Sequence, residues 1–102
     1  MNDIEVKDML EAGGLCLLDF YADWCVPCKN LAPTIEELKE EYEGRVNIGS
    51  VNVEDCPEAS TNAMIRNIPT LILYRDGVAI DKLVGGVSKD KISSIIESAL
   101  NG

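Results

Sequence analysis

The sequence predicts an α/β domain, a mixed sheet of about four strands with helices on both faces. Three observations indicate this fold class. The chain has 102 residues, of which 46% are hydrophobic, and this is enough for one core. Short apolar runs alternate with segments of helical periodicity, in the order helix, strand, helix, strand, helix, hairpin, helix. No repeat and no Pro/Gly/Ser-rich linker divides the chain, so residues 1–102 are expected to form a single domain.

The first two elements are a short helix and a buried strand. Asn2 or Asp3 can cap the helix, which is expected to end at the glycine pair 13–14. Residues 15–22 form a nearly continuous apolar run, which is typical of a central strand covered on both faces. Asp19 interrupts this run, so a carboxylate is expected inside an otherwise apolar strand.

A long helix, a second strand and a short helix follow. In residues 25–42 apolar side chains recur at intervals of three and four, so they line one helix face, and Pro33 is expected to kink the axis. Residues 46–53 alternate apolar with small or polar side chains, which indicates a strand. Pro57 suits the first position of a third helix that runs to about Met64.

The last third predicts a hairpin and a final helix. Apolar residues 71–74 and 78–80 flank a turn at 75–77 that contains a glycine. The glycine pair 85–86 breaks the chain, and Ser88 can cap the last helix. Because a long helix joins the first two strands, we expect these strands to be parallel and the hairpin to be antiparallel at one side of the sheet.

Composition narrows the range of functions. Nine basic against eighteen acidic residues give a net charge of -9, which argues against a nucleic acid partner. The chain has no histidine, so Ser-His-Asp catalysis, Cys-His catalysis and imidazole metal sites are excluded. Residues 1–5 offer neither a basic nor an apolar leader, so we expect no secretory signal, no membrane anchor and a cytoplasmic location.

The candidate active site is the segment 24–29, with Cys25 and Cys28 at the junction of the first strand and the long helix. A thiol attacks a disulfide only as the thiolate, and the N-terminus of a helix stabilises negative sulfur. Cys25 is therefore expected to be the nucleophile. Cys28 lies one helical turn further on and can resolve the mixed disulfide that forms at Cys25.

Two other interpretations of this CxxC motif remain open. It could be half of a zinc site, but zinc needs about four ligands, and the remaining sulfurs, Cys16 and Cys56, form no second CxxC motif. It could also be a static structural disulfide, although cytosolic disulfides tend to be catalytic or redox-sensing. We therefore expect no metal and a redox-active disulfide.

Several separated motifs together resemble the thioredoxin family, over nearly the whole chain. They are residues 19–29 (DFYADWCVPCK), 31–33 (LAP), 65–70 (IRNIPT) and 84–85 (VG). This set is far more specific than a CxxC motif alone. The resemblance implies the thioredoxin fold and a monomer that reduces protein disulfides without a bound cofactor. It also implies recycling by a thioredoxin reductase, either NADPH-linked or ferredoxin-linked.

The resemblance also implies roles for single residues. Asp19 would be the buried carboxylate that assists proton transfer at the resolving thiol, Pro69 a cis-proline that faces the disulfide, and Ile68 the residue that pairs by its backbone with the substrate. A flat apolar patch around an exposed Cys25 sulfur would bind extended protein segments. Its members would be Trp24, Val26, Pro27, Ile68, Val84 and Gly85.

The chain departs from the family pattern in three places. Val26 stands where most thioredoxins have glycine, and Ser50 where many carry a lysine near the buried carboxylate. The N-terminal residues match the first helix and not the edge strand that precedes it in thioredoxins. We therefore expect about four strands instead of about five, and one sheet edge that is less covered.

Two other functions, a glutaredoxin-like enzyme and a pure binding module, agree less well with the sequence. A glutaredoxin-like enzyme would share the glycine pair 85–86, but the acidic chain lacks a basic groove for glutathione. A pure binding module would gain nothing from the paired thiols. Cys16 is expected to pack as a small apolar residue. For Cys56, which precedes Pro57, exposure with secondary oxidation or dimerisation is a minority alternative.

Overall fold

Four strands form one mixed sheet in the computed structural model, which describes residues 1–102. The sheet order is β2-β1-β3-β4, with β1 parallel to β2 and antiparallel to β3, and with β3 antiparallel to β4. The expectation of a four-stranded mixed sheet is confirmed. The strands are β1 (Leu15–Tyr21), β2 (Asn47–Asn52), β3 (Thr70–Arg75) and β4 (Val78–Val84).

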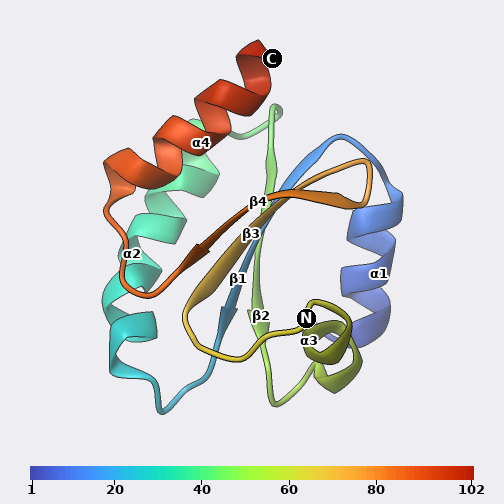
Figure 1. Ribbon diagram of the computed structural model, residues 1–102, viewed down its shortest axis with the longest axis vertical. Coiled ribbons are helices and arrows are strands. Elements are labelled where there is room, and N and C mark those ends of the chain that lie inside the picture. Colours follow the sequence, from blue (N-terminus) through green and yellow to red (C-terminus); the bar gives the residue numbers. More distant parts are fainter.

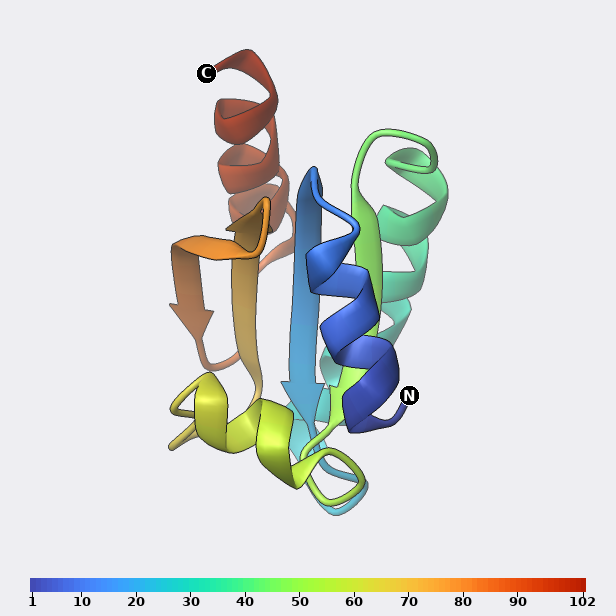
Figure 2. The same ribbon diagram turned by 90° about the vertical axis from the view of Figure 1, so that its right-hand side faces the viewer.

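Helices cover both faces of the sheet. Figures 1 and 2 show α2 and α4 on one face and α1 and α3 on the other. This confirms the predicted layers. No helix has both the length and the apolar character that a membrane crossing requires. The helices are α1 (Asp3–Glu11), α2 (Val26–Glu41), α3 (Pro57–Asn62) and α4 (Lys89–Asn101).

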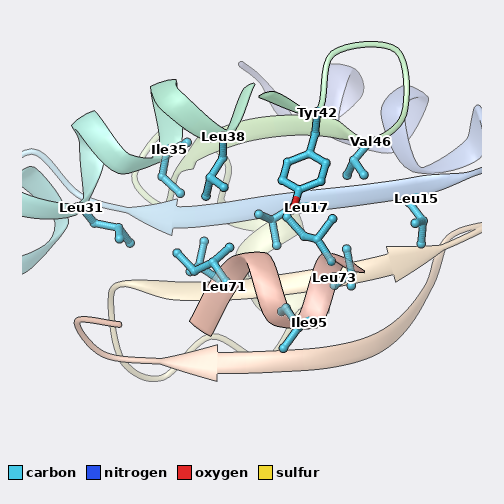
Figure 3. Close-up of a cluster of buried hydrophobic side chains, with 12 residues drawn as sticks. Leu15, Leu17, Leu31, Ile35, Leu38, Tyr42, Val46, Leu71, Leu73 and Ile95 are labelled. Atoms are coloured by element: carbon cyan, nitrogen blue, oxygen red, sulfur yellow. The ribbon is translucent and has the colours of Figure 1, made fainter. Parts of the chain in front are cut away.

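Alternation along β1 divides the core into two clusters. Leu15 and Leu17 belong to the cluster beneath α2 and α4, which Figure 3 shows in close-up. Cys16, Leu18 and Phe20 belong to the cluster on the face of α1 and α3. Side chains of a strand alternate between its faces, so the near-continuous apolar run reflects burial on both sides. By the same alternation Asp19 lies on the α2 face of the sheet.

The ends of the elements follow the local signals closely. Asn2 caps α1 through a reciprocal capping box with Glu5, and the Ser88 side chain accepts a hydrogen bond from the N–H of Lys91 at the start of α4. In the hairpin turn Asp76 and Gly77 both have positive φ, as a tight two-residue turn requires. These caps and this turn fix where the helices and the hairpin begin.

Two element lengths differ from the prediction. The third helix ends at Asn62, not at about Met64, because Met64 has a positive φ that terminates a right-handed helix. The last strand runs to Val84 and not only to Ile80, because backbone pairing with β3 continues although the β4 side chains are mostly exposed. Side-chain patterning misses strand residues of this kind.

Candidate active site

Cys25 and Cys28 form a disulfide at the first turn of α2, with Cα atoms 5.2 Å apart. Cys25 is the N-cap residue: its backbone is extended, and its sulfur accepts a hydrogen bond from the N–H of Cys28 at 3.2 Å. Pro27 stands in the first turn, where a missing N–H costs nothing. The sulfur of Cys25 therefore occupies the position where a helix offers its unpaired N–H groups.

The electrostatics of this turn favour a negative sulfur. The positive end of the α2 dipole points at Cys25, and the first turn carries no acidic side chain that would oppose it. A thiolate at this position is stabilised by the dipole and by the N–H that already contacts the sulfur. The local geometry therefore suits Cys25 as a nucleophile.

The burial of Cys25 corrects one expectation. The sequence predicts an exposed sulfur, but in the disulfide form Cys25 is only 5% exposed. It forms a small buried cluster with Ala22 and Cys28, against which the partly buried Ile68 packs. The Cys28 sulfur and the segment that carries Ile68 cover it, and local sequence around the CxxC motif reports neither.

The segment before β3 reaches the cysteine pair from a distant part of the sequence. Figure 1 shows this segment and the start of α2 at the same end of the sheet. The Ile68–Pro69 peptide bond is cis, and Pro69 is buried. The Pro69 carbonyl accepts a hydrogen bond from the N–H of Gly85 at 2.9 Å. Ile68, Pro69 and Gly85 are thus brought together beside the disulfide.

The other predicted patch residues face solvent around this cluster. The exposed fractions of Trp24, Val26 and Val84 are 68%, 63% and 50%, which is high for large apolar side chains. Val84 pairs with Thr70 across the hairpin, next to the cis-proline segment. The predicted patch thus consists of buried residues next to the Cys25 sulfur and exposed apolar residues around them.

Asp19 is buried behind the cysteine pair. It is 3% exposed, and its Oδ1 atom has no hydrogen-bond partner in the protein. Burial raises the pKa of Asp19 to about 6, although the charge of Lys39 opposes this rise. Asp19 and Cys28 line one pocket of about 470 Å³. A carboxyl group with this pKa can take up or release a proton near neutral pH.

Lys39 is a residue of this pocket that the sequence reasoning missed. It lies on α2, eleven residues after Cys28, and eleven residues make close to three helical turns. Ala32, Glu36 and Lys39 consequently share the pocket-facing side of the helix with Cys28. This spacing could have indicated that Lys39 and Cys28 share a helix face. Only the packing of α2 on β1 shows that this face is directed toward Asp19.

Both remaining cysteines are buried. Cys16 is 2% exposed, and burial raises the pKa of its thiol to about 11, which fits the expected apolar packing. The alternative in which Cys56 is exposed is contradicted: Cys56 is 0% exposed, and its thiol donates a hydrogen bond to the Met1 carbonyl at 3.0 Å. The N-terminal segment covers it, because Asp3 accepts hydrogen bonds from the first turn of α3.

Comparisons with known proteins agree with one another. A family model described as Thioredoxin matches residues 2–98. Thioredoxin C-2 of Corynebacterium nephridii is 41% identical over 90 residues, which cover 88% of this chain and 83% of that protein. A thioredoxin of Staphylococcus saprophyticus is 38% identical over 98% of this chain and 95% of its own. A solved structure of a mutant thioredoxin from Halobacterium salinarum NRC-1 has a TM-score of 0.86 at 32% identity and covers 96% of this chain and 85% of that chain.

Proposed function

This chain belongs to the thioredoxin family and is a protein thiol–disulfide oxidoreductase, and from this premise we propose that Cys25 is its attacking thiol and Cys28 its resolving thiol. The Cys25 thiolate attacks one sulfur of a substrate disulfide and releases the other sulfur as a thiolate. Cys28 then loses its proton and attacks the Cys25 sulfur, which frees the second substrate thiol. Two electrons pass to the substrate, and the protein is left with the Cys25–Cys28 disulfide.

The N-cap position of Cys25 carries this assignment. Its sulfur already accepts the Cys28 N–H at 3.2 Å, at the positive end of a helix of 16 residues. Both cysteines are almost fully buried in the disulfide form, at 5% and 3% exposed, so the N-cap position and not exposure distinguishes Cys25 from Cys28. The attacking thiolate is therefore formed at Cys25.

Asp19 is proposed as the group that receives the proton of Cys28. It shares a pocket with Cys28, and burial brings its pKa to about 6, close enough to neutrality for a base that must also release its proton. The chain contains no histidine that could take this role. No other buried carboxylate lines the pocket.

The substrate is proposed to bind as an extended segment along the cis-proline loop. The N–H and C=O of Ile68 form no hydrogen bond within the protein, so they are free to pair with a substrate backbone. The exposed apolar side chains of Trp24, Val26 and Val84 flank this site together with Pro27 and Gly85. Main-chain pairing of this kind suits many protein disulfides and depends little on their sequence.

Insulin disulfide reduction by the dithiol form tests the two cysteine roles. We expect Cys25→Ser to abolish turnover, because no other thiol lies at the N-cap of α2. Cys28→Ser is expected to retain the first attack and to accumulate a mixed disulfide at Cys25, which mass spectrometry detects. Full activity of Cys25→Ser, or a mixed disulfide at Cys28 in that variant, would contradict the assignment.

The finer properties of the protein are also part of the proposal. We propose that residues 1–102 act as one thioredoxin domain, a cytoplasmic monomer that a thioredoxin reductase recycles. Assays with an NADPH-linked and a ferredoxin-linked reductase identify the electron donor, and size-exclusion chromatography gives the oligomeric state. Turnover that depends strictly on glutathione would favour a glutaredoxin-like activity, and a disulfide inert to dithiothreitol would favour a binding module.

A further inference from the structure

Ser50 is the uncharged residue of β2 that lies next to Asp19. In the parallel pairing of β1 and β2, Ser50 stands directly opposite Asp19. Ser50 lines the same pocket as Asp19 and Cys28 but brings only a hydroxyl. A carboxylate that is 3% exposed and whose Oδ1 lacks a hydrogen-bond partner is costly to ionise without a nearby cation.

A cation reaches this pocket from the other wall. Lys39 lies on α2 and lines the pocket together with Asp19, and its side chain is 34% exposed. Its Nζ forms an ion pair with Glu36 Oε1 at 3.1 Å, one turn earlier on the same helix face. It forms no salt bridge with Asp19, so any effect on that carboxylate acts through space.

We propose that Lys39 is a positioning residue that supplies, from the helix, the positive charge that Ser50 does not supply from the strand. It favours the ionised form of Asp19 and so keeps this group able to accept the Cys28 proton near neutral pH. This inference rests on the proposed role of Asp19. It assigns to Glu36 an opposing role, because the Glu36 carboxylate partly neutralises Lys39.

The charges around the pocket single out Lys39. Among them, it is the group whose charge lowers the pKa of Asp19 against the rise caused by burial. Lys29, on the same helix, also lines the pocket, but its side chain is exposed. The titratable or charged groups that line the pocket with Asp19 are Tyr21 of β1, Asp23 of the following loop, and Cys28, Lys29, Glu36 and Lys39 of α2.

The direct test is the titration of the Asp19 carboxyl group by NMR in the oxidised protein, where the cysteine pair does not titrate. In Lys39→Gln we expect Asp19 to titrate about 0.5–1 pH unit higher than in the unmodified protein. In Glu36→Gln we expect a shift in the opposite direction, because Lys39 loses its counter-charge. Lys39→Arg keeps the charge and is expected to keep the titration. The double variant Lys39→Gln, Ser50→Lys is expected to restore it from the strand side.

Lys29→Gln is the matched control, because it removes the same charge from the same helix and the same pocket wall. It is expected to leave the Asp19 titration unchanged. An unchanged midpoint in Lys39→Gln, or an equal shift in Lys29→Gln, overturns the proposal. Thermal unfolding of each variant verifies that the fold is intact.

A second readout separates this inference from the proposed function. The acidic limb of the pH profile for insulin reduction is expected to move upward in Lys39→Gln by the same amount as the Asp19 titration. If the titration moves and the profile does not, Lys39 acts on Asp19 but Asp19 is not the base. If Asp19→Asn also leaves the release of substrate from Cys25 unchanged, the role of Asp19 fails independently of the coupling to Lys39.

Discussion

Asp19 shows at the scale of one residue how a reactive group opposes stability. Its pKa is about 6 in the folded protein, above its ordinary value of 3.8, and burial is the main cause. Between these two values the folded state binds more protons than the unfolded state, so stability falls as the pH rises through this window. Above it, the ionised carboxylate costs up to about 3 kcal/mol.

Asp19→Asn removes this cost and is therefore expected to stabilise the protein. In the oxidised form we expect a gain of about 2–3 kcal/mol in the free energy of unfolding at pH 8. At pH 4 the gain is expected to be small, because the buried carboxyl is then already neutral. Urea unfolding at both pH values measures it. An equal gain at pH 4 and pH 8 would show that the substitution acts through packing and not through charge.

At the scale of elements, α3 depends on a residue of α1 for its start. Cys56 is the N-cap residue of α3 but provides no side-chain hydrogen bond. Asp3 provides it instead: Oδ1 accepts the N–H of Ala59 at 2.8 Å and Oδ2 that of Glu58 at 3.3 Å. One carboxylate thus caps a helix 55 residues away and holds the N-terminal segment over Cys56.

Asp3→Ala is expected to destabilise the protein by about 1 kcal/mol, the usual value of an N-cap. It is also expected to speed the reaction of Cys56 with a thiol reagent in the native oxidised protein, because Met1 no longer stays over this thiol. Asp8→Ala is the matched control, since Asp8 lies on the same helix, is exposed and forms no side-chain hydrogen bond. If Cys56 reacts as slowly in Asp3→Ala as in Asp8→Ala, Asp3 does not hold the N-terminal segment over that thiol.

At the scale of the whole molecule, the features that depend on local sequence could be predicted. The capping residues Asn2 and Ser88, the burial of β1 on both faces and the position of Cys25 at a helix start all depend on a few neighbouring residues. The contact of Lys39 with the Asp19 pocket was not predictable, nor was the burial of Cys56. Both depend on how elements distant in sequence pack, which periodicity does not report.

The net charge of -9 affects the stability of the whole molecule. Four salt bridges engage only Lys7, Lys39 and Lys89 with glutamates, so most acidic side chains lack a basic partner. Exposed pairs contribute little to stability, whereas the excess negative charge repels itself in the compact state. Repulsion is therefore expected to outweigh the local pairs at low salt.

Salt is consequently expected to stabilise the protein. Raising NaCl from 10 to 200 mM shortens the screening length, and we expect Tm to rise by about 2–5 °C, the shift that roughly 0.5–1 kcal/mol produces in a domain of this size. Lys89→Gln removes the partner of Glu37 and Glu41, so its Tm is expected to depend on salt more steeply. Calorimetry of both proteins across the salt series measures this. A Tm that falls with salt would mean that the ion pairs between α2 and α4 stabilise the fold by more than the excess charge destabilises it.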